Sequence, residues 1–220
     1  MSELDSDKIG MNAHLYAVKL YTASVTKKTR SSYHHGNLRQ ALLAAALELV
    51  REQGVGVISL REVARRAGVS HAAPAHHFGD KAGLLTALAA EGFEKFGAAL
   101  RASADRAGDR SNQRFAWVGW GYVMFAAEHR AYFEIMFRPE LLHYDDPQLA
   151  AAAGNAYSVL TESVRAEHGA DASAEALELH AISAWSQVHG LATLWLHGNL
   201  PQHAGHAELD RLARKLFGLA

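Results

Sequence analysis

The sequence contains no cysteine and only four prolines among its 220 residues. Without cysteine, disulfide bonds and thiolate metal sites are excluded, and a reducing compartment, the cytoplasm, is expected. Long apolar runs are also missing, because the most apolar windows, 117–127 and 182–196, are interrupted by polar residues or glycine before the ~20 residues of a membrane-spanning helix are reached. The acidic start does not resemble a signal peptide. We therefore expect no membrane partner.

Alternating apolar and polar residues, the pattern of a half-buried strand, are almost absent, whereas apolar residues recur at spacings of three and four. This spacing predicts an all-α fold. The first helix carries Leu38, Leu42, Ala45 and Leu49 on one face and ends before Gly54. Further helices are expected from Asp80 through Leu100 and at 112–128, 131–137, 147–168, 173–197 and 207–216.

Between the first helix and Asp80, two short helices are separated by a glycine turn. Ser59 and Glu62 have the spacing of a capping box, which predicts the start of one helix. Gly68 supplies a left-handed turn residue, and Ser70 is expected to cap the next helix. Pro74 would then lie about four residues into that helix and distort its first turn. Two such helices indicate a helix-turn-helix.

Charge is divided unevenly along the chain. Residues 27–81 contain nine basic and four acidic side chains, a net of +5, whereas residues 82–220 contain eleven basic and sixteen acidic ones, a net of −5. A basic N-terminal third is expected to face a polyanion such as double-stranded DNA, although charge alone would fit an ordinary solvated surface.

A helix-turn-helix places the start of its second helix at the base edges and holds phosphates with surrounding basic groups. Ser70 and His71 could hydrogen bond to bases, and Ala72 and Ala73 could contact thymine methyl groups. The residues expected around phosphates are Arg30 in a basic arm, Arg39, Ser59, His76, His77 and Lys81.

The stretch ISLREVARRAGVSHAAPAHHFGDKAGLL resembles the DNA-binding module of the TetR family of transcriptional repressors. The matching residues are Ala67-Gly68-Val69-Ser70, His77-Phe78, Lys81 and Leu84-Leu85, while Ala75 and His76 stand where aromatic residues are usual. Residues 185–190 resemble the subgroup with a W-x-x-x-H-G motif in its ligand-binding domain.

This resemblance implies three parts: a disordered extension with a basic arm at 1–30, a DNA-binding domain at 31–82, and an effector-binding and dimerisation domain at 83–220. An effector cavity is expected to be lined by Trp120, Phe125, Met136, Phe137, Tyr157, Trp185 and His189. These residues could equally be ordinary core, and His189 could be a core histidine with its hydrogen bonds satisfied. The last two helices, with apolar residues such as Leu191, Leu194, Leu209 and Leu216, are expected to pair with a second subunit.

Two other classes of site compete with this interpretation. His71, His76 and His77 could suggest zinc, but residues five apart do not share one helical face, so no metal is expected. No serine-nucleophile elbow, zinc-peptidase motif or phosphate-binding glycine loop is present, and no cofactor or enzyme activity is expected. The sequence therefore predicts a homodimeric repressor released from a palindromic operator by a small molecule. A DNA-binding protein without an effector, or a helical enzyme, are the alternatives.

Overall fold

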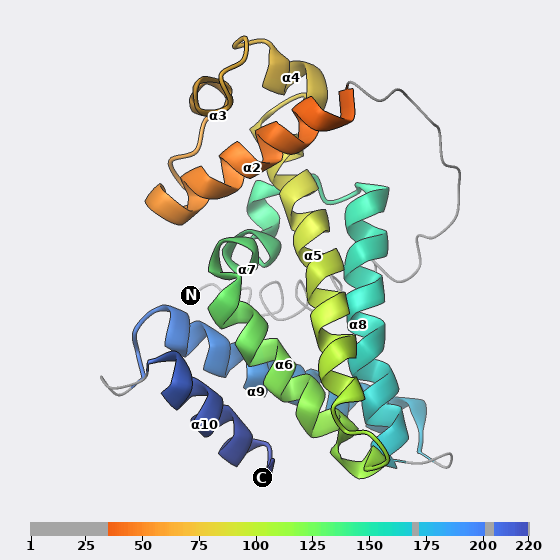
Figure 1. Cartoon of the computed structure of the whole chain (residues 1–220). Coiled ribbons are helices and arrows are strands. Elements are labelled where there is room, and N and C mark those ends of the chain that lie inside the picture. The colour runs from red at the N-terminus through yellow and green to blue at the C-terminus, as the bar shows by residue number, and fades with distance from the viewer. Residues whose placement is uncertain (1–34, 169–171, 201–204, 220) are drawn as a thin grey trace, which may run out of the picture.

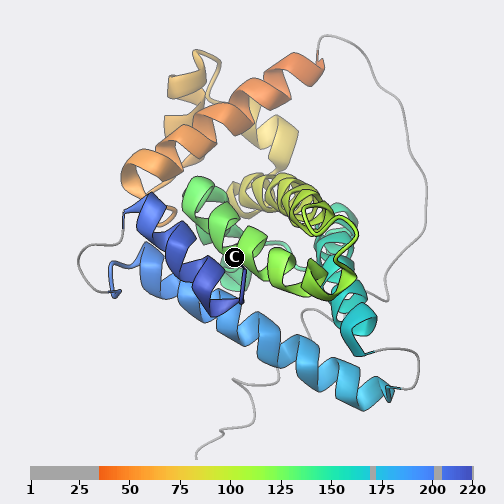
Figure 2. The same ribbon diagram turned by 60° about the horizontal axis from the view of Figure 1, so that its bottom comes forward.

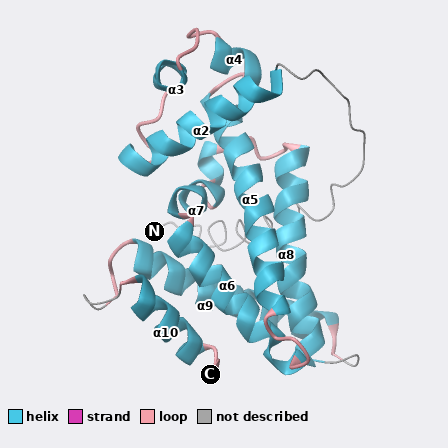
Figure 3. Ribbon diagram, viewed as in Figure 1, coloured by secondary structure: helices cyan, strands magenta, loops and turns pink. Residues whose placement is uncertain are grey.

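The structure is a computed structural model, and it describes residues 35–168, 172–200 and 205–219. Every regular element within these residues is a helix, which confirms the predicted all-α fold (Figure 3). The predicted extension at 1–30, with Arg30, lies outside the described residues. No described helix has both the length and the apolar character needed to cross a membrane.

The helices follow the predicted order closely. They are α2 (His35–Gln53), α3 (Leu60–Ala67), α4 (Ala73–Phe78), α5 (Lys81–Asp105), α6 (Arg114–Glu128), α7 (Arg130–Met136), α8 (Pro147–His168), α9 (Ala174–Leu196) and α10 (His206–Leu216). Two single 3-10 turns, η1 (Ser111–Gln113) and η2 (Pro139–Leu141), lie before α6 and after α7.

Helices α2, α3 and α4 gather at one end of the molecule, and α5 runs from this end into the rest of it (Figure 1). The small N-terminal core is built from Leu42 and Leu49 of α2, Val63 of α3, and Leu84 and Leu85 of α5, all at most 1% exposed. Burying each such leucine contributes about 2 kcal/mol. The predicted domain boundary between residues 82 and 83 falls in the first turn of α5, so both parts share this helix; the division itself stays a prediction.

The larger C-terminal part is organised around α5, which packs against α6, α7 and α8. Helix α9 crosses α6 and α8, and α10 covers the outer side of α6 (Figure 2). Phe125, Ile135 and Leu149 are at most 2% exposed and bring α6, α7 and α8 into one core with α5. Packing on three sides therefore fixes the helix that also carries the N-terminal domain.

The turn between α3 and α4 confirms one local prediction and corrects another. Gly68 has φ 68° and donates its N–H to the Ala64 and Arg65 carbonyls, as expected for a left-handed helix end. However, α4 begins at Ala73, so Ser70 is not its cap; the Ser70 carbonyl instead accepts the N–H of Ala73 at 3.0 Å. Because of this extra turn at 70–73, α4 begins three residues later than predicted.

The late start of α4 also changes the role of Pro74. It is the second residue of the helix and is buried, so the predicted distortion of the first turn was wrong. Amides in the first turn have no intrahelical acceptor, and proline therefore costs no hydrogen bond there.

The predicted capping box is half formed. The Ser59 hydroxyl accepts the Glu62 N–H at 3.2 Å, but the Glu62 carboxylate pairs with Arg65, whose Nε lies 3.0 Å from Glu62 Oε2.

Candidate functional site

The turn before α4 and the outer face of α4 form an open surface. Ser70, His71 and Ala72, predicted to read bases, are exposed, and Ala73 is half-buried. All but Ala73 lie in the turn rather than on the helix, because α4 begins later than expected. The buried Pro74 anchors the helix from behind. The surface is small and carries few hydrogen-bonding groups.

Sequence reasoning missed Ala75 as part of this surface. Ala72, Ala75 and His76 are all exposed, and spacings of three and four put them on one face of the helix. His77 is half-buried, and its ring lies edge-on to that of His76 with the centroids 5.6 Å apart. The helical period would have shown Ala75 had the start of α4 been known.

Two of the predicted phosphate contacts hold the N-terminal domain together in the structure. The Arg39 guanidinium lies 5.2 Å from the centroid of the Phe78 ring, a cation–π contact between α2 and α4. Lys81 Nζ donates to the Gly56 carbonyl at 3.1 Å and ties α5 to the loop before α3. Both cations therefore lie beside α4 in fixed positions.

The ion pairs of this domain leave one exposed arginine that sequence reasoning overlooked. Arg51 pairs with Glu48, Arg65 with Glu62, and Arg66 with Glu52, each at 2.5 Å. Within the described residues, no carboxylate pairs with Arg61, which is exposed in the first turn of α3 beside the cap Ser59.

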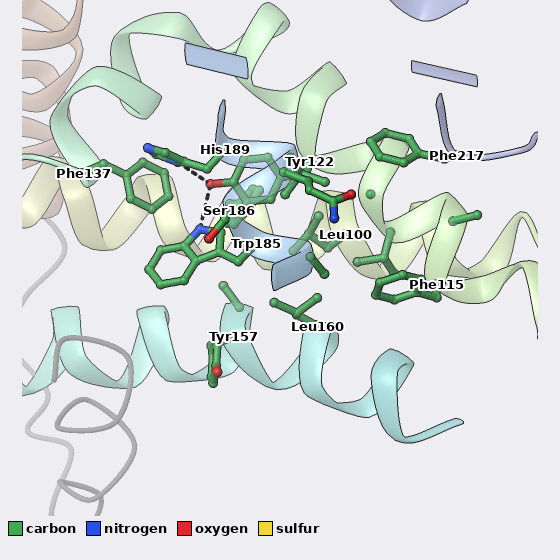
Figure 4. A pocket seen from close by; sticks show the side chains of 18 of the residues that line it. Leu100, Phe115, Tyr122, Phe137, Tyr157, Leu160, Trp185, Ser186, His189 and Phe217 are labelled. Carbon is green, nitrogen blue, oxygen red and sulfur yellow. Dashed lines mark hydrogen bonds between the residues drawn. The ribbon is translucent and has the colours of Figure 1, made fainter. Parts of the chain in front are cut away.

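A cavity of about 760 Å³ lies in the C-terminal part, between α5, α6, α8 and α9 (Figure 4). Five of the predicted effector-contacting residues line it: Met136, Phe137, Tyr157, Trp185 and His189. Sequence reasoning missed several others from α5, α6, α8 and the end of α10, among them Phe93, Phe96, Phe115, Tyr122, Leu160 and Phe217. The wall of the cavity is therefore largely apolar and rich in aromatic side chains, as in many small-molecule sites.

Two predicted wall residues lie elsewhere. Phe125 is 2% exposed and packs on Phe96 and His129, with ring centroids 5.0 and 4.7 Å away. Trp120 is turned toward α10, where its Nε1 donates to Asp210 Oδ1 at 2.7 Å. Residues two or five apart on a helix, as Trp120 is from Tyr122 and from Phe125, point to different sides, and the sequence alone did not show which side of α6 faces the cavity.

A hydrogen-bonded group of three side chains occupies one end of the cavity. Trp185 Nε1 donates to the Tyr122 hydroxyl at 3.2 Å, and the same oxygen lies 2.8 Å from Nδ1 of His189. Burial raises the pKa of Tyr122 far above its usual range, and it lowers the pKa of His189. At neutral pH, both groups are therefore uncharged.

Apolar side chains remain exposed on the last two helices. Leu194 of α9 is 45% exposed and Leu216 of α10 is 59% exposed, as expected for a face that pairs with a second subunit. Leu179 of α9, at 61%, was not predicted. Leu209, which was placed on this face, is instead 0% exposed within the protomer, because α10 turns it onto α6.

Among the described residues, no three His, Asp or Glu side chains gather in an arrangement that could hold a metal ion.

Comparison with known proteins addresses both halves of the chain. The family described as bacterial regulatory proteins, tetR family, matches residues 42–88, and the tetracyclin repressor-like C-terminal domain matches residues 115–217. The chain belongs to the TetR family of transcriptional regulators. This confirms the family resemblance and the expectation of a regulator rather than an enzyme. The narrower resemblance to the W-x-x-x-H-G subgroup stays a prediction.

Solved structures agree with this membership. A protein of unknown function from Rhodococcus sp. RHA1 is 36% identical with a TM-score of 0.69, over 87% of this chain and 100% of that one. The TetR family transcriptional regulator PfmR from Thermus thermophilus has the same fold at 17% identity, with a TM-score of 0.61 over 80% of this chain and 94% of that one.

A curated relative, the HTH-type transcriptional regulator BetI of Rhizobium meliloti (strain 1021), is 47% identical over 49 residues. This match spans 22% of this TetR-family chain and 24% of the relative, so the similarity concerns about a quarter of that protein.

Proposed function

We propose that this TetR-family regulator is a repressor that binds a palindromic DNA operator as a homodimer and leaves it when a small molecule enters the C-terminal cavity. Release by an effector is supported by one observation. A cavity of about 760 Å³, rich in aromatic side chains, lies against α5, the helix that also bears the DNA-binding domain. A regulator without an effector has no need of such a space, because protein cores are normally close-packed.

The DNA surface is the turn at 70–72 and the outer face of α4. His71 and Ser70 offer hydrogen bonds to base edges, and Ala72, Ala73 and Ala75 offer methyl contacts. Phosphates on either side are held by basic groups and by amides at helix ends. The candidates for these positions are Arg30, Arg39, Ser59, Arg61, His76, His77 and Lys81.

The dimer is supported by the exposed apolar side chains of α9 and α10, Leu179, Leu194 and Leu216. A two-fold axis through this face would set two copies of α4 at a fixed separation. For a helix-turn-helix dimer that separation is about one turn of DNA, ~34 Å, so the two half-sites of the operator are expected to be inverted copies.

Release follows from coupling between the cavity and the α4 spacing. A ligand that favours a dimer with wrongly spaced recognition helices weakens DNA binding, and DNA weakens the binding of that ligand by the same factor. Helix α5 lines the cavity with Phe93, Phe96 and Leu100 and reaches α4 at its other end. The position of α5 is therefore what both the ligand and the DNA would affect.

Selection from random duplexes by the purified full chain tests this function. We expect one enriched inverted repeat, bound with two protomers and resistant to scrambled competitor at two salt concentrations. His71→Ala should change the selected sequence, whereas Ala104→Gly, a buried change at the far end of α5, should leave it unchanged. Binding that is weak, wholly salt-sensitive and without sequence preference would refute the repressor assignment.

A further inference from the structure

The polar end of the cavity has a limited supply of hydrogen-bonding atoms. An indole N–H can only donate, so Trp185 occupies one lone pair of the Tyr122 oxygen. The remaining bond, between that oxygen and His189 Nδ1 at 2.8 Å, can run in either direction (Figure 4). The direction decides what the three residues offer to a ligand.

Counting donors and acceptors favours one direction. If Tyr122 donates to Nδ1, the neutral imidazole carries its proton on Nε2, and that N–H is the single donor left over. If Nδ1 donates instead, the Tyr122 hydroxyl proton lacks an acceptor and the Nε2 lone pair also lacks a donor. The first arrangement leaves fewer strong groups unpaired, so His189 presents Nε2–H.

The surroundings leave this N–H available to a ligand. The His189 ring lies against Phe137 and Phe133, with centroids 4.8 and 5.5 Å away, and rings supply no good acceptor. Within the described part of the chain, no group hydrogen bonds to Nε2 of His189. His189 lines the cavity, and its Nε2 is not among the buried described atoms without a partner, of which Trp117 Nε1 is the one example, so Nε2 keeps some exposed surface.

The charged residues of the cavity wall further limit which ligands can bind. Glu167 is the single charged residue among the described lining residues, and it is an exposed side chain whose Oε2 lies 3.7 Å from His180 Nε2. Among the described residues, no lysine or arginine lines the cavity, so a carboxylate would be buried without a cation. An ammonium group at the polar end would meet an N–H donor instead of an acceptor.

We propose that the cavity selects an uncharged, largely aromatic molecule with one acceptor oxygen, such as a ketone, ester or ether, which receives the Nε2–H of His189. This inference rests on the proposed function only in taking the cavity for the effector site. The apolar and aromatic wall supplies most of the contact area, and the Nε2–H of His189 orients the ligand at the polar end formed with Tyr122 and Trp185.

Four probes with one biphenyl skeleton test the proposal. They are methyl biphenyl-4-carboxylate, biphenyl-4-carboxylate, biphenyl-4-yltrimethylammonium and 4-ethylbiphenyl, titrated calorimetrically into the DNA-free full chain. The ester should bind about tenfold more tightly than the hydrocarbon, the gain of one hydrogen bond, and at least about tenfold more tightly than either ion. An ester no better than the hydrocarbon, an ion that equals it, or no binding by any probe would overturn the proposal.

Variants of His189 test whether its Nε2–H is the hydrogen-bond donor to the ligand. His189→Phe should abolish the preference for the ester over 4-ethylbiphenyl, and His189→Gln, which keeps an N–H donor, should retain part of it. Ser186→Ala is the matched control, because the Ser186 hydroxyl lines the cavity but already donates to the Ile182 carbonyl at 2.8 Å. A preference unchanged in His189→Phe would remove His189 from the site. Should that variant not fold, the four-probe comparison on the unmodified chain still decides.

DNA release is measured separately, on the selected operator. An ester that binds with the expected preference but leaves the DNA complex intact would refute effector release while the ligand class stands. Conversely, a different compound that releases the DNA while the ester does not bind would refute the ligand class alone.

Discussion

Nε2 of His143 lies 2.9 Å from Oδ1 of Asp80, and this contact joins the loop before α8 to the first turn of α5. The same Asp80 oxygen accepts the Gly83 N–H at 2.8 Å and so caps α5. The His143 N–H donates to the buried Thr86 hydroxyl at 2.8 Å. Because Pro139, four residues earlier, lines the cavity, a short segment connects the cavity wall with the cap of the helix that carries α4.

Substitutions of Asp80 and His143 should distinguish the contribution of the α5 cap from that of the His143–Asp80 contact. Asp80→Ala removes both and should lower the free energy of unfolding by about 1–2 kcal/mol, a typical value for a lost cap. Asp80→Asn retains the cap and should cost less, and His143→Ala, which loses only an exposed pair, should cost less than about 1 kcal/mol. Urea unfolding of the three variants gives the order. A larger loss in His143→Ala than in Asp80→Ala would contradict the assignment of the cap to Asp80.

The junction of α4 and α5 also predicts an unusual glycine effect. A Cβ on Gly83 would lie 2.0 Å from the Phe78 carbonyl oxygen, and backbone cannot move aside cheaply. Gly83→Ala should therefore destabilise the protein by more than about 1 kcal/mol. In an ordinary helix interior, alanine is instead more stable than glycine by about 0.5–1 kcal/mol.

Gly119→Ala in α6 is the control for this effect, because its nearest neighbours lie at an ordinary 3.5 Å. Gly119→Ala should be neutral or slightly stabilising when the thermal unfolding of both variants is measured. Equal effects of the two substitutions would mean that the α4–α5 junction yields easily.

The sequence predicted the helices well, because their faces, caps and breakers are local signals. Asp80 and Ser59 do cap α5 and α3, and the predicted bounds of α8 agree with the structure. The error at α4 arose from the turn at 70–73: the Ser70 hydroxyl could cap a helix, yet α4 starts after Ala72, which makes no side-chain cap hydrogen bond. Val69 and Pro74 pack inward there, and burial decided the register over side-chain capping.

Arg61 and Arg65 lie on the same short helix and allow a matched test of phosphate binding. Arg65 is engaged by Glu62, with its Nη2 2.5 Å from Oε1, whereas no carboxylate in the described chain pairs with Arg61. Arg61→Ala should weaken DNA binding across all sequences and reduce the slope of log affinity against log salt by about one. Arg65→Ala should change both less. Mobility-shift titrations over several salt concentrations, with selected and scrambled duplexes, measure the two effects.

The cavity was harder to predict than the fold, because its wall comes from six helices, α5 to α10. Trp185, His189 and Tyr157 were found from their aromatic character, but the same criterion also selected Trp120 and Phe125, which face other helices. Tyr122 was passed over, although it holds the central oxygen of the polar group. Which side of α6 faces the space depends on where α9 and α10 pack, and this is a tertiary property that no local pattern encodes.

Acid should weaken the fold through His189. Burial lowers its pKa in the folded protein, whereas the unfolded chain has a value near the ordinary ~6.5, so between the two values the unfolded state binds more protons. Stability from neutral His189 is therefore fully present above about pH 6.5 and is lost as the pH falls toward the folded pKa. His189→Gln cannot titrate, and its free energy of unfolding should decrease less between about pH 7.5 and 5.5.

Urea unfolding at the two pH values measures this difference. Ser186→Ala, a neighbouring change without a titrating group, should keep the pH dependence of the unmodified chain. His129 supplies an independent check, because burial also lowers the pKa of its imidazole between α6 and α7. The double variant His129→Gln and His189→Gln should have a flatter profile than either single variant, since the two rings titrate separately. A profile that stays as steep as in the unmodified chain would mean that neither imidazole is held neutral by the fold.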